Sequence, residues 1–366
     1  MRKLHESYLF KRTGKVVPNR TLLAAMTNKQ SHKNGVLSNE EIKWLSRRAK
    51  GGFGIITTAA ANVSQDGKAW EGELGIFNDN HIDNLNILTD SIHSHDSLVF
   101  AQLFHGGMRS PQSLTGVTPI SASKLKCDNS ENGFTYSASE NNIKRIIMDF
   151  TSAAVRCVHA GFDGIEIHGA HGYLISQFLG TISNVRKDKW GGDLKGRARF
   201  LIKILKSIKK NVPDSFLVGV RISPEIIDMG INLHDSIKLT GILRDEGVDF
   251  IHLSCWDAFS TSEYYPNNPK TLTELFTESY NNLPSIISTG SVWSSKDAYK
   301  LIQQGADLIG VARVGIPYPD WAKNLFDSDY NPPLPPYTPR YLRGVDLSDT
   351  FIDYMRNWKG FVSDDI

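Results

Sequence analysis

Short runs of apolar residues alternate with longer stretches of helical periodicity along this 366-residue chain. Short apolar runs are typical of strands that are buried on both faces of a parallel sheet. The chain contains eight such runs, and we predict a strand at each of them: 21–25, 54–58, 98–103, 164–168, 217–222, 250–254, 286–288 and 308–311.

Helical signals fill the intervals between the predicted strands. Ser38 and Glu41 have the spacing of a capping box, in which each side chain can satisfy a free N–H of the first helical turn. Apolar residues three and four positions apart mark one face of the longer helices. These signals predict helices over residues 38–50, 143–161, 200–208 and 294–305.

Eight strands that alternate with helices predict a single-domain α/β fold, a closed (β/α)8 or TIM barrel of ~250 residues plus insertions. A doubly wound open sheet is the competing arrangement, but no GxGxxG motif follows the first predicted strand. The extra length falls in long loops after strands 3 and 4, at 110–139 and 181–196. We therefore assign residues 1–330 to the barrel.

The segment that begins at Asn331 differs in composition from the barrel. Five prolines occur between Pro332 and Pro339. Proline fixes φ and lacks a backbone donor, which favours an extended conformation. We predict a Pro-rich, extended C-terminal tail over residues 331–366.

Composition argues against several classes of partner. The chain has 41 basic and 39 acidic residues, a net charge of +2, without the basic surface that nucleic acid or an anionic membrane requires. No run reaches the ~18 apolar residues that span a membrane, and the first 20 residues lack the apolar centre of a signal peptide. The three cysteines form no CxxC pair, which fits a reducing compartment, and we expect a cytoplasmic protein.

The most informative motif follows the fourth predicted strand. That strand runs directly into His168, and His171 and Tyr173 come next. Two imidazoles and a phenol at the end of a buried strand can hold an anionic oxygen and donate a proton, which polarises a carbonyl group. Two histidines three positions apart could also bind zinc, but no HExxH-type third ligand accompanies them, and we predict no metal site.

Other polar and small residues stand near the ends of the predicted strands, Gln102 and Arg221 within them and the others just past them, where barrel enzymes place their sites. They are Met26, Thr27, Gln102, Arg221, Gly290, Ser291, Ala312 and Arg313. Gly290 allows close backbone approach to an anion and Arg313 adds charge, which predicts a phosphorylated ligand. Plainer interpretations stay open: Arg221 as an ion-pair partner, Gly290 as a turn residue and Met26 as packing.

The chain resembles the old yellow enzyme family of FMN-dependent oxidoreductases, especially its bacterial members, from about Leu9 to Leu325. The resemblance is most specific over 168–179 and 184–200, and 101–107 and the Ala312–Arg313 turn support it. Ala25 stands where the family usually has proline, and Thr27 occupies a position that is cysteine in some members.

The resemblance implies FMN at the carboxyl end of the barrel and a role for each matching residue. Ala25, Met26, Thr27 and Ala59 would line the flavin, Gln102 would bond its pyrimidine ring, Arg221 would lie near N1 and O2, and Gly290, Ser291, Ala312 and Arg313 would hold the phosphate. His168 and His171 would bind the oxygen of the substrate carbonyl, and Tyr173 would donate a proton.

The resulting hypothesis is an FMN enzyme that takes a hydride from NADPH or NADH and passes it from flavin N5 to an α,β-unsaturated carbonyl compound. The partner would be a small molecule, and the sequence leaves open whether the chain forms a homo-oligomer. Three rivals remain at this stage: a metal-dependent barrel hydrolase that uses His105, His168 and His171, an FMN barrel that acts on RNA bases, and a non-catalytic ligand-binding barrel.

Overall fold

The computed structural model describes residues 4–364. Its centre is a closed barrel of parallel strands, because the first strand pairs with the last as well as with its successor. The barrel strands are β3 (Thr21–Leu23), β4 (Ile55–Asn62), β6 (Leu98–Phe104), β9 (Gly164–Gly169), β10 (Leu217–Ile222), β11 (Phe250–Ser254), β12 (Ser285–Thr289) and β13 (Leu308–Val311). The predicted TIM barrel and all eight of its strand positions are confirmed.

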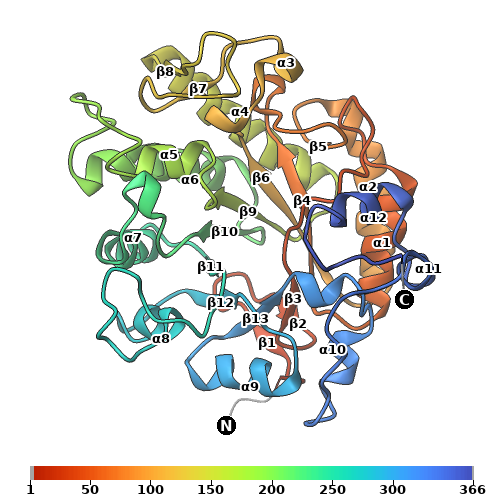
Figure 1. Ribbon diagram of the computed structural model, residues 1–366. Helices are drawn as coiled ribbons and strands as arrows, with labels where there is room; N and C mark the ends of the chain where they lie inside the picture. The colour runs from red at the N-terminus through yellow and green to blue at the C-terminus, as the bar shows by residue number, and fades with distance from the viewer. Residues whose placement is uncertain (1–3, 365–366) are drawn as a thin grey trace.

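Helices surround the ring of strands on its outer side (Figure 1). They are α1 (Asn39–Lys50), α2 (Ile82–His93), α4 (Glu140–His159), α6 (Leu194–Asn211), α7 (Leu233–Asp245), α8 (Leu272–Thr277) and α9 (Ser295–Gln303). Half of the predicted capping box of α1 is present: the Ser38 side chain accepts a hydrogen bond from the backbone N–H of Glu41, but the Glu41 carboxylate accepts from Asn28 and Ser31 instead. The helix that was predicted to start near residue 200 begins earlier, after the Asp193 cap.

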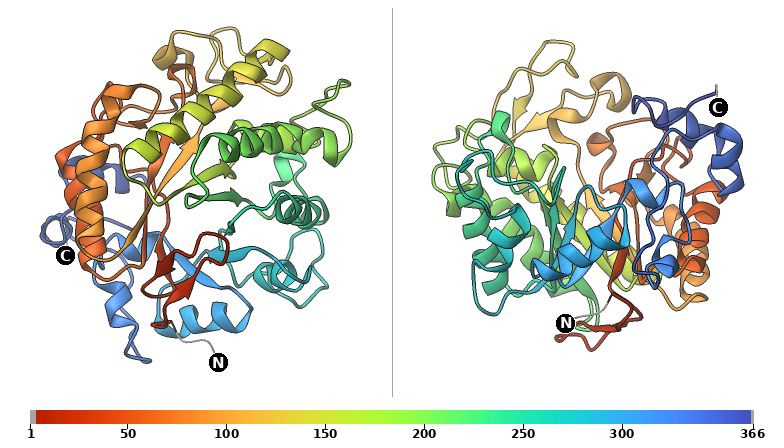
Figure 2. Two further views of the ribbon diagram at one scale, coloured as in Figure 1. Left: turned by 180° about the vertical axis from the view of Figure 1, so that it is seen from behind. Right: turned by 60° about the horizontal axis from the view of Figure 1, so that its bottom comes forward.

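The amino-terminal end of the barrel is filled by aromatic rings. Phe100 and Phe250 stack with their centroids 5.2 Å apart, and the Phe10 ring lies 6.2 Å from that of Phe250. Phe10 follows the short strand β1 (Tyr8–Leu9), whose hairpin with β2 (Val16–Val17) crosses this end of the barrel (Figure 2). Apolar packing therefore closes this end of the barrel.

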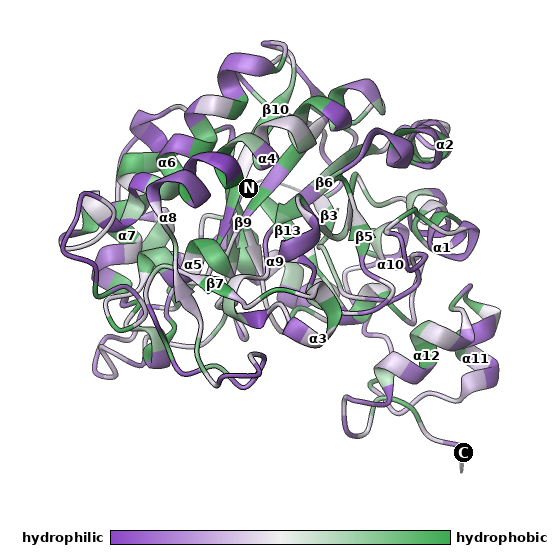
Figure 3. Cartoon of the chain, turned by 90° about the horizontal axis from the view of Figure 1, so that it is seen from above, coloured by the Kyte–Doolittle hydropathy of each residue, from purple (hydrophilic) through white to green (hydrophobic). Residues whose placement is uncertain are grey.

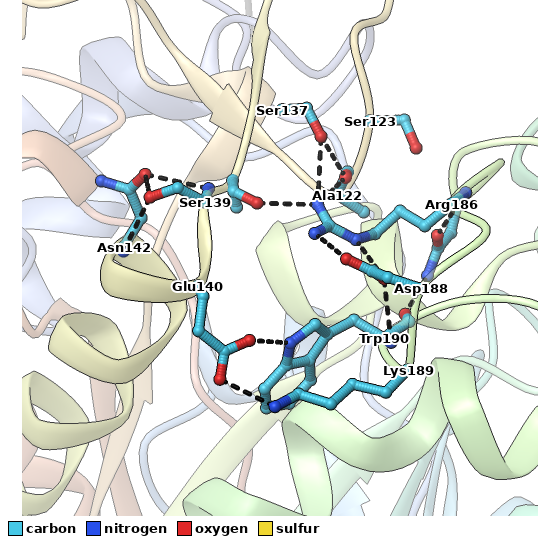
Figure 4. A network of polar contacts seen from close by, with 12 residues as sticks. Ala122, Ser123, Ser137, Ser139, Glu140, Asn142, Arg186, Asp188, Lys189 and Trp190 are labelled. Carbon is cyan, nitrogen blue, oxygen red and sulfur yellow. Dashed lines mark hydrogen bonds and ion pairs between the residues drawn. The ribbon is translucent and has the colours of Figure 1, made fainter.

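Two long loops rise from the open end, as predicted after strands 3 and 4. The first carries α3 (Gln112–Thr115), β7 (Ile120–Ser121) and β8 (Tyr136–Ser137), and the second follows α5 (Leu174–Leu179). The two loops are tied together by side chains of the second one (Figure 4). Arg186 donates to the backbone oxygens of Ala122 and Ala138, and the Trp190 indole donates to Glu140 at 2.6 Å.

The C-terminal segment departs from expectation. Residues 331–338 are non-helical, but α11 (Pro339–Gly344) and α12 (Asp349–Met355) follow α10 (Trp321–Asn324) and the proline-rich stretch. The prediction of an extended tail is wrong for these two helices, which lie at the rim of the molecule (Figure 3). The reason is local: Pro339 occupies the first turn of α11, where proline favours helix initiation instead of breaking the helix.

The apolar face of α12 anchors this segment to the barrel. Phe351 is fully buried, and its ring meets that of Trp44 on α1 edge-on at 5.2 Å. The Ser348 hydroxyl, which caps α12, also donates to the Gln30 side chain at 2.6 Å. The segment is therefore packed against the barrel. No helix within residues 4–364 is long and apolar enough to cross a membrane.

Candidate active site

A cavity of about 540 Å³ opens at the carboxyl ends of the barrel strands. Most of the residues singled out in the sequence line it: Ala25, Met26, Thr27, Gln102, His168, His171, Tyr173, Arg221, Gly290, Ser291, Ala312 and Arg313. The fold thus gathers residues from six segments of the chain around one cavity, as their positions at the ends of successive strands required.

Ala59 is the exception, because Ala60 lines the cavity in its place. The register between β4 and β6 shifts there: Thr57 pairs with Phe100, but Ala60 pairs with Gln102. Two residues of β4 therefore face one residue of β6, which is a β-bulge and reverses which side chains point inward. A bulge of this kind leaves no mark in a run of alanines.

His168 ends β9 and is buried. Its Nδ1 accepts a hydrogen bond from the backbone N–H of Ala170 at 3.4 Å, so the ring proton belongs on Nε2. Burial, with the nearby His171 and Arg221, lowers the pKa of His168 well below its usual range. The side chain is therefore a neutral hydrogen-bond donor.

His171 stands in a strained turn. Its φ of 60° is uncommon for a residue other than glycine, and such strain is characteristic of functional sites. The backbone N–H donates to the Ser223 hydroxyl at 3.1 Å, and Nε2 lies 2.7 Å from the Ser254 hydroxyl. Burial and the Arg221 charge lower the pKa of His171 to about 3. The ring crosses that of His168 at 86°, with centroids 4.9 Å apart.

Tyr173 completes this wall at the N-terminus of α5. Its ring centroid lies 5.1 Å from that of His168 and 5.0 Å from that of Phe104, which meets it edge-on. Burial raises the pKa of Tyr173 to about 12, so the phenol keeps its proton at neutral pH. Three uncharged donors therefore face one cavity.

A buried polar network lies beneath the cavity, and sequence reasoning did not assign it. The Gln102 side-chain amide donates to Glu166 Oε1 at 2.6 Å, and Arg221 Nη1 lies 4.0 Å from the same oxygen. Glu166 Oε2 is 2.5 Å from His252 Nδ1, and His252 Nε2 is 2.5 Å from the Thr289 hydroxyl. Burial raises the pKa of Glu166, but the His252 and Arg221 contacts outweigh it, and the net pKa is lowered.

This network fixes the direction of the Gln102 amide. Because its nitrogen donates to Glu166, its oxygen is the group that remains for a ligand in the cavity. Arg221 is buried as well, and its Nε has no hydrogen-bond partner among the described residues. Glu166 and His252 stand inside apolar strands of the sequence, and this pattern indicates a buried polar network, since buried polar groups need partners.

The turns after β12 and β13 form a cradle for an anion. Gly290 has φ 148°, and a Cβ there would lie 2.6 Å from the Cys255 backbone oxygen, so only glycine fits. Arg313 Nη2 lies 3.4 Å from the Ser291 hydroxyl. Clustered backbone N–H groups beside an arginine suit a phosphate.

Residues that sequence reasoning missed come from loops, from the last position of β11 and from the C-terminal segment. They are Trp70, Arg109, Ser254, Tyr354, Met355 and Trp358. Burial raises the pKa of the Tyr354 phenol, and a hydrogen bond with Thr27 opposes that rise. The α12 helix therefore contributes directly to the cavity wall beside β3.

The metal-dependent alternative finds no ligand set. Within the described part of the chain, no three His, Cys, Asp or Glu side chains are grouped to hold a metal ion. His105, the third histidine of that alternative, accepts a hydrogen bond from the backbone N–H of Gly107 at 3.0 Å, and its Nε2 lies 3.6 Å from Asp66.

Comparison with known proteins decides the family. The family model described as NADH:flavin oxidoreductase / NADH oxidase matches residues 10–329. The chain belongs to this family. It is 33% identical over 323 residues to a Bacillus subtilis (strain 168) protein named "Probable NADH-dependent flavin oxidoreductase YqiG", covering 87% of this chain and 86% of that one.

Two further similarities concern a longer protein and a solved fold. The chain is 33% identical to the NADH:fumarate oxidoreductase of Klebsiella pneumoniae (strain 342), covering 85% of this chain and 35% of that protein. The structure of the old yellow enzyme homologue from Zymomonas mobilis superposes with a TM-score of 0.80 at 24% identity, covering 93% of this chain and 96% of that one.

This flavin oxidoreductase therefore uses FMN, with NADH or NADPH as reductant. The residues present suit FMN on three separate grounds. Gly290 and Arg313 offer an anion cradle, the Gln102 oxygen offers an acceptor, and the buried Arg221 Nε offers a donor without a partner. Bound FMN would be held by these groups at the floor and one side of the cavity.

Proposed function

We propose that this enzyme reduces the carbon–carbon double bond of α,β-unsaturated carbonyl compounds at the expense of NADH or NADPH. The observation that supports the proposal is the convergence of His168, His171 and Tyr173 on one cavity wall, each as a neutral donor. Bound FMN supplies the hydride, which adds to the β-carbon of the substrate.

His168 and His171 bind the carbonyl oxygen. Negative charge grows on this oxygen as hydride reaches the β-carbon, so donors aimed at it stabilise the transition state more than the ground state. Removing one such donor costs ~2.7–4 kcal/mol in comparable sites. The lowered pKa values of both histidines suit this role, because a neutral imidazole donates to the oxygen and keeps its proton.

Tyr173 gives its proton to the α-carbon and thereby completes the reduction. The sum of the two steps is one hydride and one proton added across the double bond, while one NAD(P)H is oxidised. A positioned general acid accelerates such a step by ~10²–10⁴-fold. Arg109, whose guanidinium carbon lies 5.0 Å from the Tyr173 ring centroid, favours the anionic phenolate that remains after transfer.

The test is a stopped-flow comparison of Tyr173→Phe with the parent enzyme. Reduction of bound flavin by NADH should keep its rate, while reoxidation by cyclohexenone should slow by ~10²-fold or more. Equal slowing of both half-reactions would contradict the proton-donor role. A parent enzyme that is bleached by NADH but not reoxidised by any unsaturated carbonyl compound would contradict the proposed function itself.

A further inference from the structure

The charge lining the cavity is entirely positive. Arg109, Arg221 and Arg313 line it, and no aspartate or glutamate does so within residues 4–364. An arginine in a ligand cavity is a fixed, permanently charged fork that matches a carboxylate or a phosphate. Each of these three arginines should therefore have a negatively charged or electron-rich partner, either in the protein or in a bound ligand.

Two of the three arginines already have a role. Arg221 lies 4.0 Å from the buried Glu166 carboxylate and donates to the Ala25 backbone oxygen. Arg313 stands in the anion cradle beside Ser291, where the FMN phosphate belongs. The cofactor accounts for both, and Arg109 is left over.

Arg109 lies on the substrate side, next to the proposed proton donor. Its guanidinium carbon is 5.0 Å from the Tyr173 ring centroid, and Nη1 donates to the His171 backbone oxygen at 2.7 Å. That single bond holds the fork in place and leaves its other N–H groups available. Arg109 forms no ion pair with a carboxylate of the described chain.

We propose that the substrate of this enzyme carries a carboxylate, and that Arg109 binds it. The inference rests on the proposed function and names its substrate class. Four groups are neighbours on the wall: the His171 and His168 rings are 4.9 Å apart, His168 and Tyr173 are 5.1 Å apart, and Arg109 lies 5.0 Å from the Tyr173 ring and bonds to the His171 backbone oxygen. An oxygen site, a proton donor and a carboxylate site this close together suit a compact unsaturated acid that carries both a carbonyl and a carboxylate.

A purely structural role for Arg109 is the rival explanation. The guanidinium could serve only to orient Tyr173 and the turn that holds His171. The two roles are separated by a matched pair of substrates, trans-4-oxopent-2-enoate and its methyl ester. Both contain the same unsaturated ketone, and only the acid offers a charge.

The experiment measures kcat/KM for both compounds in the parent enzyme and in Arg109→Met. The ratio of acid to ester should fall by about tenfold or more in the variant, the order expected when a charge-assisted hydrogen-bonded pair is lost. The ester rate should fall only as far as Arg109 stabilises the Tyr173 phenolate, a loss that both compounds share and that the ratio cancels. Flavin reduction by NADH should be preserved. Arg340→Met removes an exposed cation outside the cavity and should leave the ratio unchanged.

Binding provides a second readout that does not depend on turnover. Calorimetry should show that levulinate, the saturated product, binds the parent holoenzyme more tightly than methyl levulinate, and that Arg109→Met removes the difference. The advantage of the acid should also shrink at high salt, since screening weakens an accessible ion pair.

Each other outcome overturns the inference in a recognisable way. Equal losses for acid and ester would assign Arg109 to orientation alone, and an unchanged ratio would remove it from recognition. If the parent enzyme reduces the ester well but shows no contribution of the carboxylate, the substrate class is wrong while the proposed function stands. If it reduces neither compound nor cyclohexenone, the proposed function fails and this inference fails with it.

Discussion

The Gln102 amide nitrogen lies 2.6 Å from a carboxylate oxygen of Glu166, beneath the floor of the cavity. Both side chains are buried, and Arg221 lies 4.0 Å from the same oxygen. The contact sets which atom of Gln102 faces a ligand and places a negative charge beside Arg221, which also lines the cavity.

Glu166→Gln should raise the midpoint potential of the bound FMN. Without the carboxylate, the Arg221 charge is no longer offset, and it stabilises the more negative, reduced form of the flavin. The rise should be about 30 mV or more, which is a tenfold change in a two-electron equilibrium. Spectroelectrochemical titration measures it. An unchanged or lower potential would show that Arg221 does not respond to Glu166.

Gly290→Ala should weaken FMN binding. A Cβ at this position would meet the Cys255 backbone oxygen at 2.6 Å, so the anion cradle has to distort. Flavin fluorescence titration of the apoprotein should show a loss of about tenfold or more, because one strained or displaced backbone site costs ~1–3 kcal/mol. Gly116→Ala is the matched control, because φ there is 74° with nothing within 4 Å of the added Cβ.

The reoxidation rate should be nearly independent of pH between about 5 and 9. The pKa of His171 is lowered to about 3 and that of Tyr173 is raised to about 12, so neither group titrates in this range. Stopped-flow reoxidation over a pH series measures this. An inflection near pH 6.5, the ordinary value for histidine, would show that His171 is protonated during turnover.

The same lowered pKa of His171 has a consequence for stability. In the unfolded chain the imidazole binds a proton below about pH 6.5, whereas in the folded protein it does so only near pH 3. The contribution of His171 to the free energy of unfolding should therefore be fully present above pH 6.5 and should be lost as the pH falls toward 3. Denaturant titrations of the parent enzyme and His171→Asn should show a shallower decline in the variant.

Phe351→Ala should loosen the C-terminal segment and leave the barrel folded. The phenyl ring is fully buried against Trp44, and removing a buried ring of this size costs ~3–5 kcal/mol. Hydrogen exchange should rise in residues 339–355 and stay low in the barrel strands. Phe326→Ala, at a residue 72% exposed, should change neither. Exchange that rises throughout the barrel would mean that the segment and the barrel unfold as one unit.

The barrel could be predicted from the sequence because strands buried on both faces must be apolar along their whole length. The positions after those strands could be predicted for the same reason, since all strands of a parallel barrel end on one face. Ala60 lines the cavity instead of Ala59 because of a bulge, where backbone hydrogen bonds and not side-chain chemistry set the register. Because Glu166 and His252 lie in apolar strands, the sequence shows that each needs a buried hydrogen-bond partner. The identity of each partner depends on which strands are neighbours in the barrel.

Contacts between segments far apart in the chain were beyond prediction. Tyr354 contacts Thr27 in a segment that is held in place by the buried side chains of Phe351 and Leu342. The prolines that precede these residues predict an extended chain and not the helices that bury them. Arg109 stands near Tyr173 because each follows one of the paired strands β6 and β9, and the turns after these strands contact each other. The residue type alone does not place such side chains in the cavity; their tertiary contacts do.

The packed rings of Phe10, Phe100 and Phe250 close the amino-terminal end of the barrel, so ligands reach the cavity from the carboxyl ends of the strands. If NADH and the unsaturated substrate share this cavity, as the proposed function implies, the oxidised nicotinamide has to leave before the substrate can bind. Reductant and oxidant then take turns, and an excess of either one slows the other. Double-reciprocal plots of initial rate against substrate concentration should accordingly be parallel at low concentrations. They should bend upward when an excess of one substrate inhibits binding of the other.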